Sequence, residues 1–180
     1  TQRPLPVTGP RVIDYATNGR TDFLDVYLGA KCRFFIGCTS GVFAVSQIFR
    51  RPLVLTNYSL LISANTYGPN VLIIPKKLWS RKEQRFLSFR ETLQSQVGDF
   101  LHTEQFELCG IEHIENTPEE ITAVALEMEE RLNETWQTTE EDEELQRRFW
   151  SLYKPGEFNR RPASRIGAEF LRRNRELLGE

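Results

Sequence analysis

Residues that bind metals or form disulfides are scarce in this chain. It has two histidines, His102 and His113, which lie apart in the sequence, and three cysteines. An odd number of cysteines without paired spacing argues against a disulfide scaffold and is typical of a reducing compartment, so we expect a cytoplasmic protein. Because CxxC and HxxxH motifs are absent as well, we expect neither a structural zinc site nor a metal cofactor.

Long apolar runs and an excess of charge are also missing. No apolar run approaches the ~18 residues that span a bilayer, and the longest candidate is interrupted by Arg50, Arg51 and Pro52. The formal net charge of −2 provides no general attraction to nucleic acid or to anionic membranes. We therefore expect no nucleic-acid partner and no membrane span, and peripheral membrane association is not evident in the sequence.

What remains is the composition of an ordinary globular protein, with 39% apolar and 27% charged residues. Residues 1–10 hold three prolines and no hydrophobic signal core, which is typical of a linker. Because the chain also lacks an initiator Met, we expect it to be a piece of a longer protein.

Strand-like and helix-like segments alternate in the first half of the chain. Apolar runs predict strands at 12–16, 32–38, 53–56 and 71–74, and helical spacing predicts helices at 22–30 and 42–49. Asp22 is the expected cap of the first helix. This alternation predicts an α/β fold with a doubly wound, mostly parallel, Rossmann-like sheet. The carboxyl ends of its strands then share the edge at which such sheets bind ligands.

The second half is expected to be mainly helical. Thr117, Pro118 and Glu120 predict a helix start, as N-cap, first-turn proline and capping box. The other predicted elements are a helical segment at 79–97, an outer strand at 111–115, a helix from 140 that Pro155-Gly156 ends, and a helix at 166–178. We divide the chain into a linker (1–11), a Rossmann-like domain (12–137) and C-terminal helices (138–180) that pack on this domain or on an N-terminal domain expected before it.

Polar groups follow three of the predicted strands. Thr39-Ser40-Gly41 opens a helix whose free N–H groups and dipole attract anions. Asn57 can hydrogen-bond a sugar hydroxyl or a base, and Lys76 or Lys77 can neutralise a diphosphate. Each has a plainer alternative that stays open: a cap and turn, an Asx turn, or solvated lysines. The chain has neither a GxGxxG fingerprint nor a P-loop.

Four further side chains are candidates for chemistry. Asp25 lies close to the same edge by topology and can contact a sugar or nucleotide hydroxyl. Cys38 lacks an evident base nearby, so we expect it to serve packing. Neither histidine is assigned a catalytic role, because His113 falls in a strand-like segment and His102 in an expected loop.

An ordered set of segments resembles the C-terminal portion of a family of bacterial proteins assigned as glycosyltransferases with the two-domain glycosyltransferase-B fold. No segment is specific alone, but together they span nearly the whole chain. They are Val12-Ile13-Asp14-Tyr15, Asp22-Phe23-Leu24-Asp25, Phe35-Ile36-Gly37-Cys38-Thr39-Ser40-Gly41, Pro52-Leu53-Val54-Leu55-Thr56-Asn57, Ile74-Pro75-Lys76, Asn116-Thr117-Pro118-Glu119-Glu120-Ile121, Glu127-Met128 with Arg131-Leu132, Leu145-Gln146 with Arg148-Phe149, and Arg165-Ile166-Gly167 with Phe170-Leu171.

The resemblance implies transfer of a sugar from a nucleotide-sugar donor to a glycan or other acceptor during polysaccharide or glycoconjugate synthesis. It places the donor diphosphate at Thr39, Ser40 and Gly41, and it implies catalysis without a bound metal. It also implies that the N-terminal domain supplies acceptor contacts and often the catalytic base, so the chain alone is expected to be inactive. Two alternatives are a non-catalytic nucleotide- or phosphate-binding regulatory module and a sugar-nucleotide epimerase. Epimerases of this fold typically continue the Ser-Gly turn with a nearby Glu, which residues 42–45 lack.

Overall fold

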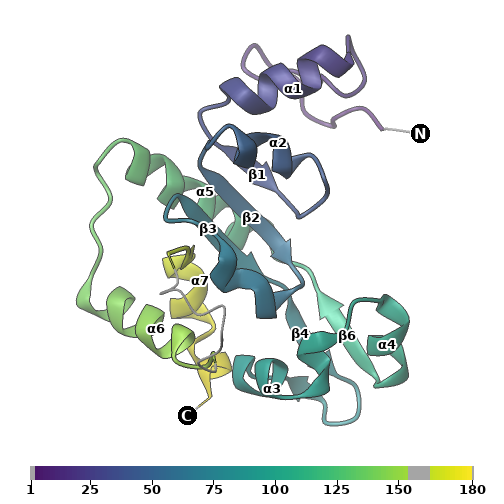
Figure 1. The fold of residues 1–180 in the computed structure, drawn as a ribbon, viewed down its shortest axis with the longest axis vertical. Helices are drawn as coiled ribbons and strands as arrows, with labels where there is room; N and C mark the ends of the chain where they lie inside the picture. Colours follow the sequence, from purple (N-terminus) through teal and green to yellow (C-terminus); the bar gives the residue numbers. More distant parts are fainter. Residues whose placement is uncertain (1–2, 154–162, 180) are drawn as a thin grey trace.

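A computed structural model describes residues 3–153 and 163–179 of the chain. Its centre is a four-stranded parallel sheet in the order β1-β2-β3-β7, and a three-stranded antiparallel sheet in the order β5-β4-β6 lies beside it. Figure 1 shows the smaller sheet, with α3 and α4, at the end of the molecule opposite α1. The strands are β1 (Phe35–Gly37), β2 (Leu53–Tyr58), β3 (Val71–Pro75), β4 (Lys77–Ser80), β5 (Arg85–Phe86), β6 (Ile111–Ile114) and β7 (Arg165–Ile166).

The two central strands form where the sequence has continuous apolar runs. Leu53, Val54 and Leu55 on β2 are at most 1% exposed, and every residue of β3 is buried. Such runs suit parallel strands that are covered on both faces. The chain is therefore α/β with a parallel sheet and flanking helices, an arrangement compatible with a Rossmann-like fold.

The segment after β3 differs from its prediction. Only Lys76 separates β3 from β4, and the expected helix at 79–97 is replaced by β4, β5 and the short helix α3 (Phe89–Gln94). Trp79 pairs with Glu112 of β6 on one side and with Phe86 of β5 on the other, and its ring meets Phe86 edge-on at 5.1 Å. These pairings between distant segments override the local helical spacing.

The helices of the second half begin largely where their caps predict. Helix α5 (Pro118–Leu132) has Thr117 as N-cap and a capping box with Glu120, and α6 (Glu140–Trp150) is capped by Thr139 in the same way. The predicted stop at Pro155-Gly156 lies outside the described residues. The remaining helical elements are α1 (Asp22–Lys31), α2 (Phe43–Ile48), α4 (Thr103–Leu108), α7 (Ala168–Arg173), and the 3-10 turns η1 (Leu61–Thr66), η2 (Gln96–Asp99) and η3 (Arg175–Leu178).

The C-terminal segment belongs to the same core as the sheet. Phe149 of α6 and Phe170 of α7 are buried in one cluster with β2 and β3, and Phe89 of α3 packs on Phe149 with ring centroids 5.3 Å apart. The start predicted for the last helix is wrong, because Arg165 and Ile166 form β7 and pair in parallel with β3. Burial of Ile166 against this strand decides its conformation.

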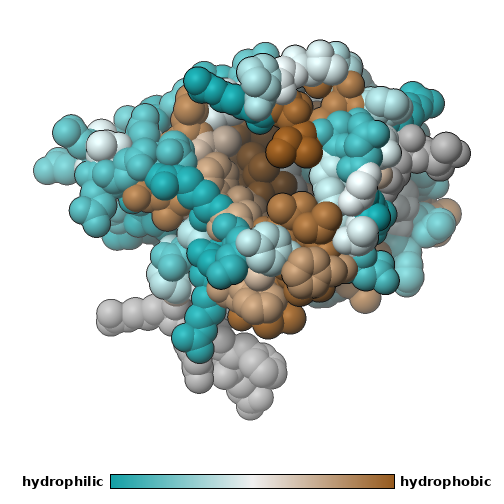
Figure 2. Space-filling model, turned by 90° about the horizontal axis from the view of Figure 1, so that it is seen from above, coloured by the Kyte–Doolittle hydropathy of each residue, from teal (hydrophilic) through white to brown (hydrophobic). Residues whose placement is uncertain are grey.

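Several side chains near the N-terminal end of the described chain are exposed. The strand expected at 12–16 is wrong: only a bridge between Gly9 and Val12 forms, and Ile13 is 83% exposed. Thr21, and not Asp22, caps α1, because the Thr21 hydroxyl accepts from the Leu24 N–H. The edge strand β1 is half-buried, where a buried strand was expected. Seen from this end, apolar side chains gather around a hollow (Figure 2).

Two features are absent from the described residues. No helix in them is long and apolar enough to cross a membrane. Within the same ranges, no three His, Cys, Asp or Glu side chains come together in a way that can hold a metal ion.

Candidate functional site

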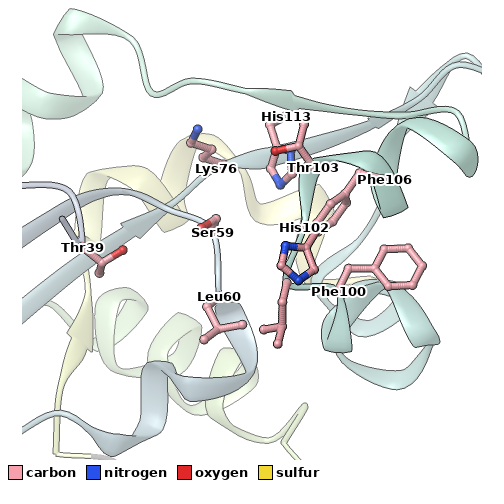
Figure 3. Close-up of a pocket in the computed structure, with 10 residues that line it drawn as sticks. Thr39, Ser59, Leu60, Lys76, Phe100, His102, Thr103, Phe106 and His113 are labelled. Carbon is pink, nitrogen blue, oxygen red and sulfur yellow. The ribbon is translucent and has the colours of Figure 1, made fainter. Parts of the chain in front are cut away.

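A pocket of about 340 Å³ opens at the carboxyl ends of the parallel strands. Thr39 follows β1, Ser59 follows β2 and Lys76 follows β3, and all three line this pocket from the sheet side (Figure 3). Parallel strands place their carboxyl ends at one edge, so three segments distant in sequence meet here. The volume lies in the range that small-molecule sites occupy.

Lys76 is the only charged side chain among the described residues that line the pocket, apart from the two imidazoles. Its backbone N–H donates to the Tyr58 carbonyl at 2.9 Å, which ties β3 to β2 at this point. Its Nζ donates to the carboxylate of Glu115 at 2.7 Å, and the side chain is 22% exposed against 65% for Glu115. The pocket therefore presents a cation whose present partner lies at the solvent boundary.

The structure separates the two lysines that the sequence left as alternatives. Lys77 lies in β4, and its Nζ donates to Glu120 at 2.9 Å with both side chains nearly buried. Asn174 adds a contact to the same carboxylate. Lys77 therefore joins β4 to α5, and Lys76 alone lines the pocket.

The wall opposite the sheet comes from the segment before and within α4. Phe100, Leu101, His102, Thr103 and Phe106 contribute to it. The Gln105 side-chain oxygen accepts from the backbone N–H groups of Leu101 and His102, at 2.9 and 3.0 Å, and so fixes this turn. In Figure 3 the ring of His102 and the aromatic rings lie across the pocket from Thr39.

His113 enters the same pocket from β6. Its backbone pairs with Leu78 of β4, and its ring meets Phe106 edge-on with centroids 4.2 Å apart. The Nε2 atom is buried and has no hydrogen-bond partner among the described residues. Burial, followed by the nearby charge of Lys76, lowers the pKa of His113, against a smaller opposite effect of Glu115. Sequence reasoning missed this residue because Lys76, which lines the same pocket, is far from it along the chain.

The turn after β1 contributes only in part to the pocket. Thr39 lines it, whereas Ser40 and Gly41 are exposed beside it. The first N–H groups of α2 are already engaged, since Phe43 and Ala44 donate to the carbonyls of Ser40 and Gly41. Among the described residues, no acceptor is found for the N–H of Gly41, so the turn itself, more than the start of α2, retains a free backbone donor.

Cys38 lies in the same turn and is exposed, so the expected packing role is wrong. Hydrogen bonds from Ser40, first from its hydroxyl and then from its backbone, lower the pKa of the Cys38 thiol, and Lys76 adds a smaller effect. A lower pKa increases the fraction of reactive thiolate at neutral pH.

Asn57 has a structural role in place of the expected ligand contact. It has a positive φ of 50°, and its Oδ1 accepts from the Asn116 N–H at 2.6 Å while its own N–H donates to Asn116 Oδ1 at 2.6 Å. Asn116 Nδ2 also donates to the Pro75 carbonyl at 2.9 Å. This reciprocal pair fastens the ends of β2 and β3 to the start of α5, and Asn57 does not line the pocket.

Asp25 is likewise not among the pocket residues. It lies on α1, where its carboxylate accepts from the Tyr15 hydroxyl at 2.8 Å and from Arg20 at 3.0 Å. The expected contact of Asp25 with a sugar or nucleotide hydroxyl therefore has no support in this arrangement, because α1 packs at the far side of α2 and β1.

Comparisons with known proteins add no relative. No family model matches the chain, and neither the curated proteins nor the solved structures contain a match.

Proposed function

We propose that this chain binds a nucleotide-sugar in the pocket at the carboxyl edge of its sheet and acts in the cytoplasm as the donor-binding half of a glycosyltransferase with the glycosyltransferase-B fold. The observation that carries the proposal is the meeting of Thr39, Ser59 and Lys76 in one pocket at three strand ends. Open α/β sheets bind ligands at this edge.

The chemistry of the pocket suits a diphosphate. Lys76 supplies a positive charge, Thr39, Ser59 and Thr103 supply hydroxyl donors, and no carboxylate stands among the described lining residues. In sugar transfer, negative charge develops on the departing nucleoside diphosphate. Donors that are already aimed at this position stabilise the transition state without further reorganisation.

The apolar part of the pocket suits a ring. Leu60, Phe100 and Phe106 supply apolar and aromatic surface beside the polar groups, together with the imidazole of His102. A nucleotide-sugar likewise combines a charged diphosphate with a planar base. We assign the diphosphate to the Lys76 side and the base or sugar ring to the α4 side.

Isothermal titration of the full-length protein against nucleoside diphosphates and their sugars tests the proposal. We expect at least one nucleotide-sugar to bind, and Lys76→Met to weaken it by about tenfold or more, the value of one charge-assisted contact. Lys82→Met is the matched control, because Lys82 is exposed and outside this pocket. Failure of the wild-type protein to bind every member of the panel would overturn the proposal.

An activity assay separates transfer from other uses of the same site. The full-length protein is incubated with the bound nucleotide-sugar, with and without a mixture of glycan acceptors. Release of nucleoside diphosphate that requires an acceptor supports transfer. An altered sugar formed from the donor alone indicates epimerisation and contradicts the transferase proposal.

A further inference from the structure

We propose that His113 donates a hydrogen bond from Nε2 to a diphosphate oxygen of the bound nucleotide-sugar, an inference that rests on the proposed function. The proposal adds His113 to the site, a residue that the sequence did not indicate. It concerns a direct contact with the ligand and makes His113 a binding residue.

The first argument is the unsatisfied atom. His113 Nε2 is buried without a hydrogen-bond partner among the described residues. Buried polar atoms in folded proteins nearly always have a partner, so each exception calls for a reason. Here the reason is at hand, because His113 lines a pocket of about 340 Å³ whose occupant can provide the missing acceptor.

The second argument is rigidity. The backbone of His113 is held in the ladder between β6 and β4, opposite Leu78, and Phe106 fixes the ring from the side with centroids 4.2 Å apart. Leu78 and Phe106 are themselves buried in a separate small core. Because the His113 side chain is already held in place, it loses little conformational entropy when a ligand binds. Such a side chain can make an effective contact.

The third argument is the charge around the imidazole. Lys76 lies on the sheet side and Glu115 two residues beyond His113, and the two form an ion pair. His102 is the other titratable side chain on the pocket wall. Burial and Lys76 together favour the neutral imidazole, which still carries one N–H that can donate. A phosphate oxygen placed between Lys76 and His113 would receive two donors, while Glu115 would move away toward solvent.

This placement predicts a pH dependence with a defined sign. An anion beside His113 stabilises the imidazolium, so binding raises the pKa of His113 from its lowered value. Affinity for the nucleotide-sugar therefore rises as the pH is lowered from 8 to 5. The diphosphate of a nucleotide-sugar is a diester that does not titrate in this range, so the ligand itself contributes no slope.

Calorimetric titration of the full-length protein tests the proposal with four variants. The probe is the nucleotide-sugar of the panel that wild type binds most tightly. His113→Phe keeps the ring against Phe106 and removes both nitrogens, and we expect it to weaken binding by about 10- to 100-fold. His113→Gln restores an N–H near the position of Nε2 and is expected to recover most of the affinity without the pH dependence. His102→Gln measures the contribution of the other imidazole of the pocket, which we expect to be smaller because His102 is exposed, and Lys82→Met, outside this pocket, is the control.

The outcomes are distinguishable from failure of the proposed function. If wild type binds no nucleotide-sugar, the proposed function itself is wrong. If wild type binds and folded His113→Phe binds equally well, only the role of His113 is overturned. Should His113→Phe fail to fold, His113→Gln decides the matter: a flat pH profile supports the contact, and an unchanged profile overturns it.

Discussion

Replacing Asn116 with alanine provides a quantitative test of how this edge is held together. The side chain is 6% exposed and makes two hydrogen bonds, accepting from the Asn57 N–H at 2.6 Å and donating to the Pro75 carbonyl at 2.9 Å. Asn116→Ala leaves both backbone groups without a partner. Each buried unsatisfied group costs about 1–3 kcal/mol, so we expect a loss of about 2–6 kcal/mol in the free energy of unfolding.

Urea unfolding followed by circular dichroism measures this loss. For a protein of this size, a change of 1 kcal/mol shifts Tm by about 2–4 °C, so thermal unfolding should show a drop of roughly 4–24 °C. Asn116→Asp refines the test, because the carboxylate keeps the acceptor for Asn57 but cannot donate to Pro75. Asn70→Ala is the control: Asn70 is exposed and its side chain bonds none of the described residues, so we expect a change within about 0.5 kcal/mol.

The reasoning is refuted if Asn116→Ala unfolds within about 0.5 kcal/mol of wild type. It is also refuted if the variant is destabilised while nucleotide-sugar affinity is unaffected under conditions where it stays folded. The reciprocal pair with Asn57 positions the strand ends from which Ser59 and Lys76 emerge, so loosening it should weaken binding at this edge.

Three further predictions concern the site and its charges. Iodoacetamide should alkylate Cys38, because Ser40 lowers the pKa of this thiol. Bound nucleotide-sugar should slow the alkylation of Cys38 but not that of Cys109, which is also exposed. Equal protection of both cysteines, measured by mass spectrometry, would argue against a ligand at this turn. Glu115→Gln releases Lys76 from its ion pair. Calorimetry should then show about two- to fivefold tighter nucleotide-sugar binding, which is the scale of an exposed ion pair. Weaker binding would show that Glu115 contacts the ligand. Acid should destabilise the fold, because Arg85 and Ser88 lower the pKa of Glu91 to about 2. The stability that ionised Glu91 contributes is complete above about pH 4.5 and is lost as the pH falls toward 2. Buried Glu127, whose pKa is raised, has the opposite effect on stability. In urea unfolding, Glu91→Gln should flatten this slope, and an unchanged slope would contradict the assignment.

The local signals in the sequence were sufficient where the structure depends on neighbouring residues. The capping box of Thr117 and Glu120 correctly predicted the start of α5, because its donors and acceptors lie within one turn. The runs around Val54 and Ile73 correctly predicted buried strands, since their composition alone requires cover on both faces. The run at 12–16 failed because an apolar segment forms a strand only when another strand is available to pair with it.

In the pocket, too, the sequence predicted the position of residues along the sheet better than the contacts of their side chains. Topology alone put Thr39 and Lys76 at one edge, and both line the pocket. It also put Asn57 and Asp25 there, but their side chains bind Asn116, Tyr15 and Arg20. Position along a strand predicts which edge a residue reaches, but it does not predict which partner its side chain finds.

The sequence by itself therefore determined the α/β class, the two central strands and the capped helices, whose causes are local. Only the tertiary structure decided that 79–97 adds strands to a second sheet, that Arg165 and Ile166 extend the first, and that His113 and Lys76 line the same pocket. These features depend on contacts between residues far apart in the chain. Their energies come from burial and hydrogen bonding that exist only after the chain has folded.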